Sequence, residues 1–314
     1  MKAFYQLSYK KPDSSVLGEL PDPLAAEGHL LITVKAVSIN PVDYKIKNGD
    51  LRFLVPSKFP KIVGTDFAGI VREVGSGVKN FKPGDRVYGA VNLFFGKQGA
   101  LAELLSTDEK STRHIPDGMS FEEAASLPVA ALTALNGLRR CGIKEGDRVF
   151  INGATGGVGH FALQIAKSKG AIITASCSDA NVSLAKQLGA HFTTLYNKPL
   201  AEPKEGPFDS ILDAYGKMSG TDINRLLKKG GTYASPLFMP PSQIPAFFTR
   251  LITGRRLTSS NMRKLPEDYE EIERLFSEKR LKPLIESIYT LDKAAEAFEK
   301  TENGKPRGKV IVTI

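Results

Sequence analysis

Two different spacings of apolar residues divide this chain near residue 120. Before that point, short β-branched runs alternate with Gly and Pro, a pattern that predicts strands joined by tight turns. The clearest runs are residues 30–40, 68–78 and 84–91. Their close spacing is typical of a small, mostly antiparallel domain that resembles a barrel.

After residue 121, helical patterns alternate with short apolar runs. The helical spacing covers residues 121–139, 158–170 and 181–190. Between and after these helices lie apolar runs that predict buried parallel strands at 148–153, 171–176, 209–214 and 231–236. Alternating strands and helices predict a doubly wound parallel sheet, so the chain is of the α/β class.

The last part of the chain changes pattern again. A helix over 267–280, an extended piece over 281–291, a helix over 292–303 and a strand over 308–314 look like a return to the first domain. We therefore expect a first domain made of residues 1–122 and 266–314. A second, doubly wound domain of residues 123–265 lies between these two segments.

A glycine loop stands between a predicted strand and a predicted amphipathic helix. Gly153 suits the tight turn, Gly156 lets the backbone approach a pyrophosphate, and Gly159 lets the helix pack on the strand. Because the strand, the helix and the following βα units all agree, we favour dinucleotide binding over a purely structural turn. The expected cofactor contacts in the loop are Gly153, Ala154, Thr155, Gly156, Gly157, Val158 and Gly159.

The end of the next strand bears on which dinucleotide binds. Ser176, Ser178 and Asn181 offer small polar groups to a 2′-phosphate, which favours NADPH. Asp179 is the objection, because an acidic residue here holds an adenosine ribose in NAD-binding proteins. Asp179 equally suits a cap for the helix that follows.

Composition narrows the classes of protein. The chain has 314 residues, 41% hydrophobic and 25% charged, which is enough for two packed domains. Two cysteines make no disulfide framework, and the four histidines never fall at metal-ligand spacing. The first residues lack a signal-peptide pattern, and no apolar run approaches the roughly 18 residues that cross a bilayer. We expect a cytoplasmic, metal-free protein.

The formal charge of +9 is concentrated between residues 225 and 264, which hold eight basic residues and no Asp or Glu. An apolar helical face in this stretch suits an anionic membrane, but we favour its packing against the protein. Nucleic acid is disfavoured because exposed aromatic residues do not interleave with the basic ones. The face comprises Ile244, Phe247, Phe248, Leu251 and Ile252, and the basic residues on or just beyond it are Arg250, Arg255 and Arg256.

Five motifs in order carry a resemblance to a known family. They are NPVDYK (40–45), KFPKIVGTDFAG (58–69), LPVAALTAL (127–135), NGATGGVG (152–159) and GKVIV (308–312). The chain resembles the zinc-independent quinone oxidoreductase and enone reductase branch of the medium-chain dehydrogenase/reductase superfamily. The resemblance implies a GroES-like catalytic domain, a Rossmann NADP-binding domain, and a monomer or homodimer.

The resemblance also implies a reaction. NADPH would deliver hydride to a quinone, or to the C=C of an α,β-unsaturated ketone or aldehyde, with water or Tyr44 as the proton donor. The rival interpretation is a nucleotide-regulated protein that binds RNA or a membrane surface without turnover. Zinc-dependent relatives carry Cys at the position of Asn40 and His-Glu at Thr65-Asp66, so no metal is expected here.

In similar enzymes the nicotinamide lies in the cleft between the domains. The resemblance places Asn40, Tyr44 and Lys45 in catalytic positions, with Lys45 also on the nicotinamide ribose. Ala180 stands where the family often has Arg, so a clamp on the 2′-phosphate is missing. The remaining expected cofactor contacts are Thr133 and Tyr215 near the nicotinamide and Tyr196 near the adenosine ribose.

Overall fold

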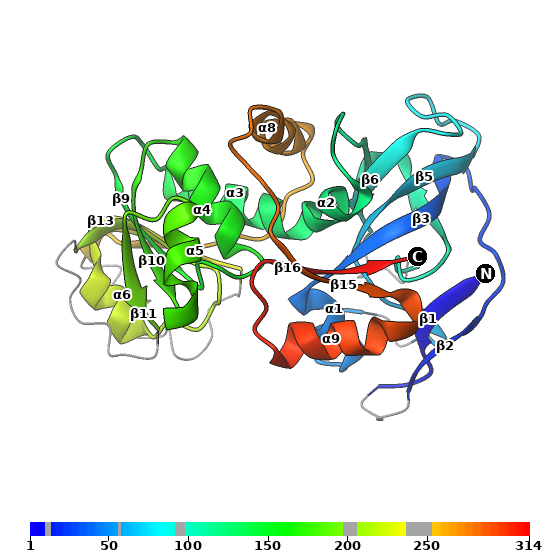
Figure 1. Cartoon of the computed structure of the whole chain (residues 1–314), viewed down its shortest axis with the longest axis horizontal. Helices are drawn as coiled ribbons and strands as arrows, with labels where there is room; N and C mark the ends of the chain where they lie inside the picture. The colour runs from blue at the N-terminus through cyan, green and yellow to red at the C-terminus, as the bar shows by residue number, and fades with distance from the viewer. Residues whose placement is uncertain (10–13, 56–57, 92–97, 197–205, 237–252) are drawn as a thin grey trace. The chain divides into compact units, whose positions relative to one another are not determined.

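The computed structural model describes residues 1–9, 14–55, 58–91, 98–196, 206–236 and 253–314 (Figure 1). The chain forms two compact units. Unit 1 comprises Met1–Val129 and Ile285–Ile314, and unit 2 comprises Ala130–Leu284.

These boundaries differ from the expected ones, which place residues 266–284 with the first domain. Helix α8 (Pro266–Ser277) belongs to unit 2 because Arg139 of α3 (Pro128–Cys141) pairs with its Asp268 and Glu271. Lys169 of unit 2 also pairs with Glu271 at 3.2 Å. The return to the first unit therefore starts at the strand that follows α8.

Unit 1 consists mainly of strands that pair antiparallel, as the sequence predicts. Its main sheet has the order β15-β16-β3-β5-β6-β8, with β7 also on β3, and a smaller sheet has the order β2-β1-β4. Only β15 and β16 run parallel among the described pairs of this unit. Its strands are β1 (Lys2–Gln6), β2 (Ser15–Glu19), β3 (His29–Ile39), β4 (Lys61–Ile62), β5 (Asp66–Val74), β6 (Arg86–Ala90), β7 (Leu104–Asp108), β8 (Thr112–His114), β15 (Ile285–Thr290) and β16 (Lys309–Thr313).

The helices of unit 1 close the ends and one side of its sheets. Helix α9 (Ala294–Asn303) packs on β15 and β16, where Figure 1 shows it in red-orange. Helix α1 (Pro41–Lys47) follows β3 directly, and α2 (Phe121–Ser126) packs on β3 and β5. A continuous apolar core, which includes Phe4, Phe67 and Leu101, lies between these elements.

Unit 2 holds a sheet whose described strands all pair in parallel, in the order β11-β10-β9-β12-β13-β14. The predicted doubly wound domain is confirmed. Helices α4 and α5 cover one side of this sheet (Figure 1). The elements are β9 (Arg148–Asn152), α4 (Gly159–Ser168), β10 (Ile172–Cys177), α5 (Val182–Gln187), β11 (Phe192–Leu195), β12 (Phe208–Asp213), α6 (Gly220–Leu226), β13 (Leu227–Ser235) and β14 (Arg256–Ser259).

The helix predicted over 121–139 is two helices. It breaks between α2 and α3 at Pro128, which has no N–H to give to the preceding turn. Strands β11 and β14 were not predicted, because their four-residue runs are too short to show a period.

Both cysteines, Cys141 and Cys177, are buried and unpaired. Among the residues that the structure describes, none of the helices is long and apolar enough to span a bilayer.

Candidate functional site

The glycine loop follows β9 and leads into α4, as predicted. Gly153 adopts φ +69°, and a Cβ there would lie 3.2 Å from the Tyr215 Cβ. A Cβ on Gly159 would lie 2.2 Å from the Gly153 carbonyl oxygen, so no larger residue fits. A Cβ on Gly156 would meet only the Gly153 oxygen, at 3.4 Å. Gly153 and Gly159 therefore shape the turn, whereas Gly156 leaves an open side.

The outer side of this loop is accessible to a ligand. Gly156, Gly157 and Val158 are half-buried, while Ala154 and Thr155 are buried beneath them. The Ala154 N–H donates to the Ser176 carbonyl at 3.0 Å and ties the loop to β10. Backbone at the start of α4 thus faces outward, which fits a dinucleotide pyrophosphate.

His160 supports the loop from within. It lies in the first turn of α4, fully buried, and its Nδ1 donates to the Gly156 carbonyl at 3.0 Å. The sequence predicts a first-turn residue without chemistry at this position, and the contact is structural.

The residues expected near the adenosine ribose differ in accessibility. Ser176 is buried inside β10, whereas Ser178 and Asn181 are half-buried after the strand ends. Asn181 Nδ2 donates to Thr155 Oγ1 at 3.2 Å, so it also braces the glycine loop. Asn181 occupies the N-cap position of α5 without a side-chain cap hydrogen bond, and Asp179, two residues earlier, is exposed. Asp179 therefore remains available to a ribose hydroxyl.

Asp213 organises the loop that carries Tyr215, in a run of residues (213–216) that the sequence places at the carboxyl edge of the sheet. Its carboxylate accepts hydrogen bonds from Asn152 Nδ2, the N–H of Gly216 and the N–H of Met218, each at 2.8 Å. The Tyr233 hydroxyl donates to it at 2.9 Å. An Asp that ends a buried strand, with Gly216 three residues later, was the signal available for this role.

Three loops of the candidate cofactor site meet at one edge of the sheet. Gly153, Ser178 and Ala214 follow the carboxyl ends of β9, β10 and β12, which are neighbouring strands. Ligands of doubly wound sheets bind at this edge. Tyr215 is half-exposed here, with the Lys217 ammonium 4.8 Å from its ring centroid. Tyr196, after β11, is also exposed.

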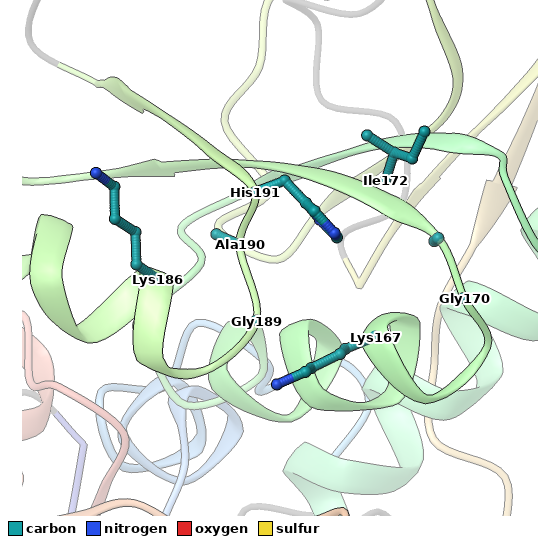
Figure 2. A pocket seen from close by; sticks show the side chains of 8 residues that line it. Lys167, Gly170, Ile172, Lys186, Gly189, Ala190 and His191 are labelled. Carbon is teal, nitrogen blue, oxygen red and sulfur yellow. The ribbon is translucent and has the colours of Figure 1, made fainter.

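A separate pocket of about 340 Å³ lies at the opposite edge of the same sheet (Figure 2). Lys167, Ile172, Lys186 and His191 line it, near the amino ends of β10 and β11. In Figure 2 the two lysine side chains do not converge on His191. This pocket is not part of the candidate cofactor site.

The predicted catalytic residues of unit 1 lie at the start of α1. Asn40 precedes the helix and is 1% exposed, while Tyr44 and Lys45 are half-buried on the helix itself. Thr133, in α3 of unit 2, is buried. The structure describes each unit by itself, and the roles of these four residues stay predictions.

Asn40 belongs to a buried polar cluster, which we define as Asn40, Asp43, Thr65, Asp66 and Lys309. Asn40 Nδ2 donates to Asp66 Oδ2 at 2.8 Å, and Lys309 Nζ donates to Asn40 Oδ1 at 2.6 Å. The Asn40 N–H donates to Asp43 at 2.7 Å, and Thr65 Oγ1 donates to the other Asp43 oxygen at 2.5 Å. Asp43 thus braces the loop before α1.

Burial dominates the ionisation of the polar cluster. It raises the pKa of Asp43 to about 6, against the hydrogen bonds from Thr65 and Asn40 and the Lys309 charge. It raises the pKa of Asp66 to about 7, against Lys309 and the Asn40 hydrogen bond. Burial also lowers the pKa of Lys309, while Asp66 and Asp43 act to raise it. Each group is less easily charged here than in water.

Two family models match the chain. Residues 26–117 match the alcohol dehydrogenase GroES-like domain, and residues 188–312 match the zinc-binding dehydrogenase family. The chain is 33% identical to a chloroplast envelope quinone oxidoreductase homolog of Arabidopsis thaliana, over 99% of this chain and 98% of the relative.

Two further relatives agree with these matches. A 2-methylene-furan-3-one reductase of Solanum lycopersicum is 33% identical, over 99% of this chain and 79% of the relative. The solved structure of the quinone oxidoreductase from Coxiella burnetii is 32% identical, with a TM-score of 0.90, and the match covers 100% of this chain and 99% of that one. None of these relatives supports the alternative of an RNA-binding or membrane-surface protein.

The name of the second family raises the question of a zinc ion. In the polar cluster the groups that could ligate a metal are an amide, a hydroxyl and two carboxylates. The Lys309 ammonium donates a hydrogen bond to that amide. An ammonium repels a metal cation, and thiolate or imidazole ligands are missing there. Across the described parts of the chain, no three His, Cys, Asp or Glu side chains gather as metal ligands. The residues present do not fit zinc.

Proposed function

The chain belongs to the medium-chain dehydrogenase/reductase superfamily, in its quinone oxidoreductase and enone reductase branch, and from that premise we propose its reaction. It is an oxidoreductase that uses a nicotinamide cofactor. We propose that it transfers hydride from NADPH to a quinone, or to the C=C of an α,β-unsaturated ketone or aldehyde. The names of its relatives, a quinone oxidoreductase homolog and an enone reductase, support both acceptor classes.

The observation that carries this proposal is the composition of the polar cluster. Zinc-dependent alcohol dehydrogenases use a Lewis acid to polarise the alcohol oxygen, and the ligand atoms here do not suit one. A quinone or an enone is already electron-poor, so its reduction needs mainly orientation and hydrogen bonding. The polar cluster therefore favours zinc-independent reduction of activated acceptors.

Residues of unit 2 would hold the cofactor. Backbone at Gly156, Gly157 and Val158 would bind the pyrophosphate, and Ser178 and Asn181 would contact the adenosine ribose or its 2′-phosphate. The Tyr215 loop, held by Asp213, would border the nicotinamide. When bound, NADPH supplies the hydride.

Residues on α1 would act near the acceptor. Lys45 would bind the nicotinamide ribose, and Asn40 would be held rigidly just before the helix. After hydride reaches the β-carbon of an enone, the enolate needs a proton at the α-carbon. Water or the Tyr44 hydroxyl would supply it. We further propose a cytoplasmic monomer or homodimer, with both buried cysteines reduced.

A panel of acceptors tests the proposal. The purified protein is assayed for loss of NADPH absorbance with a benzoquinone, a cyclic enone and an alkenal, and NADH is assayed in parallel. Secondary alcohols with NADP⁺ serve as the contrasting substrates. We expect turnover of at least one quinone or enone, a modest preference for NADPH, and no alcohol oxidation. Stoichiometric zinc whose removal abolishes activity would contradict the proposal.

A further inference from the structure

Lys309 is placed where a lysine rarely lies. Lys309 is 3% exposed, and its Nζ donates to the buried Asn40 Oδ1 at 2.6 Å. Lysine is almost never fully buried unless it is paired, because its ammonium loses hydration. Here the ammonium donates to Asn40, and the charges of two buried carboxyl groups, Asp66 and Asp43, act to raise its pKa. Its position therefore serves the electrostatics of the polar cluster.

Strand register brings Lys309 to this place. Val310 pairs with Ile39, so the preceding residue of β16 lies opposite Asn40, at the end of β3. On the other side of β3, Ser38 pairs with Asp66, the first residue of β5. Lys309, Asn40 and Asp66 thus lie side by side across three neighbouring strands.

The two partners fix the orientation of the Asn40 amide. An ammonium has only donors and a carboxylate only acceptors, so Oδ1 must face Lys309 and Nδ2 must face Asp66. The second Nδ2 hydrogen is directed to the Ser38 carbonyl, at 3.1 Å. Rotating the amide by half a turn would set NH₂ against the ammonium. Asn40 consequently offers a ligand only the remaining acceptor capacity of Oδ1.

Resting on the proposed function, we propose that Lys309 is a positioning residue of the active site. Its ammonium is the built-in cation at the place where zinc-dependent relatives gather their metal ligands. It balances Asp43 and Asp66 and holds the Asn40 amide in one orientation. Through Asn40 and Asp43 it also fixes the start of α1, which carries Tyr44 and Lys45.

The test replaces the lysine and returns its missing part as a small molecule. Lys309→Ala removes the chain beyond Cβ, and n-propylammonium is that missing part. 1-Propanol, with the same length and no charge, is the matched control. The readouts are the unfolding temperature, kcat and KM, and the hydrogen exchange of the Asn40 side-chain amide measured by NMR.

We expect Lys309→Ala to lower kcat on the order of a hundredfold. KM for NADPH should stay within about twofold, because the pyrophosphate contacts lie in unit 2. The Asn40 amide hydrogens should exchange faster. n-Propylammonium should restore the unfolding temperature, kcat and amide protection in a saturable way, and 1-propanol should not.

A second variant keeps the test decisive if Lys309→Ala does not fold. Lys309→Met with Asp66→Asn removes one charge of each sign and preserves side-chain volume. We expect this double variant to fold, to show a low kcat, and not to respond to n-propylammonium. Wild-type kcat in the double variant would overturn the proposal.

Two other results would also overturn it. One is unchanged kcat in Lys309→Ala, and the other is a restored unfolding temperature without restored kcat, which is the behaviour of a purely structural lysine. If the wild type turns over none of the acceptors, the proposed function fails by itself. The exchange of the Asn40 amide in Lys309→Ala then still decides whether Lys309 positions it.

Discussion

Asp66 makes the free energy of unfolding depend on pH, and the burial of its carboxyl group sets the sign of this dependence. An unfolded Asp has a pKa of about 3.9, whereas burial raises the pKa of Asp66 to about 7. The folded chain thus holds this proton more tightly than the unfolded chain. Its contribution to stability is complete below about pH 4 and is lost as the pH rises to about 7.

Asp66→Asn should remove this dependence. Relative to wild type, its free energy of unfolding should rise with pH by up to about 1.4 kcal/mol per unit between about pH 4 and 7. Denaturant titrations across this range measure the difference. Asp117→Asn, at an exposed position, is the control. Parallel pH curves for wild type and Asp66→Asn would show that the carboxyl is not buried as described.

Ala180 permits a test of cofactor choice at one position. It is exposed, immediately after Ser178 and Asp179, so a longer side chain can extend from the end of β10. Ala180→Arg should tighten NADPH binding by about 1–2 kcal/mol through a charge-assisted hydrogen bond to the 2′-phosphate. NADH binding should not change. Fluorescence titrations with both cofactors check this, and equal effects on both would place the 2′-phosphate elsewhere.

The sequence motifs singled out four of the five residues of the polar cluster. Asn40 and Asp43 lie in NPVDYK, and Thr65 and Asp66 lie in KFPKIVGTDFAG. Lys309 was seen only as part of a strand in the closing GKVIV motif. It lies 269 residues from Asn40, and no local spacing reveals which strands become neighbours. That pairing arises from tertiary structure.

At the level of elements, two glycines of the glycine loop have different roles. Gly159 is needed for the close packing of the loop, whereas Gly156 lies on the side where the cofactor would bind. A Cβ on Gly159 would overlap the Gly153 carbonyl at 2.2 Å, whereas a Cβ on Gly156 would make only an ordinary contact at 3.4 Å. Gly159→Ala should therefore lower the unfolding temperature and weaken NADPH binding together. Gly156→Ala should keep the wild-type unfolding temperature and weaken NADPH binding, because its methyl group faces the ligand.

Thermal unfolding and NADPH titration of the two variants measure these effects. Unchanged NADPH affinity in Gly156→Ala would remove this loop from the cofactor site. The pair is informative because the chemical change is the same in both variants, so any difference reports where each glycine faces.

Arg255 joins two elements of unit 2. Its guanidinium donates to the Asn224 carbonyl at 2.8 Å and to the Leu227 carbonyl at 2.5 Å, at the junction of α6 and β13. Arg255→Met should destabilise the chain by about 1–3 kcal/mol, the scale of hydrogen bonds to a charged group. Arg256→Met, which loses one contact to Thr232, should cost less. Equal unfolding midpoints in denaturant would contradict this structural role.

For the whole molecule, several basic residues of the 225–264 stretch form ion pairs or hydrogen bonds within the protein. Lys228 pairs with Asp209, and Arg225 pairs with Asp222 at 3.0 Å, both acids from outside the basic stretch. Arg255 is directed to backbone carbonyls. The predicted amphipathic face, with Ile244 and Arg250, lies outside the described residues. These pairings leave fewer charges for an anionic partner than the sequence suggests.

We therefore expect weak binding to anionic surfaces. Wild-type protein should not sediment with anionic vesicles, nor be retained by RNA, at physiological salt, because each uncompensated basic residue contributes only about 1 kcal/mol. Replacing Arg250, Arg255 and Arg256 by Gln should lower stability rather than change binding. Strong sedimentation of the wild type that the triple variant loses would instead support a membrane role.

The division of the chain shows where prediction from the sequence stops. Alternating strands and helices were enough to predict both units and the return of the chain to the first one. The helix at 267–280 was assigned to the wrong unit. The spacing of its apolar residues indicates that the helix packs against the protein, but it does not show which unit the helix contacts. Its acidic residues, Asp268 and Glu271, meet Arg139, which lies far away in sequence.

The strand that carries Lys309, β16, is the last strand of the chain to be synthesised. A ribosome makes all of unit 2 before it makes β15 and β16. A nascent chain that ends at residue 284 already holds Asn40, Asp43 and Asp66, but it lacks β16, which pairs with β3, and the lysine that donates to Asn40. The first unit to be translated is thus the last to be completed, and its carboxyls stay hydrated until the final strand arrives.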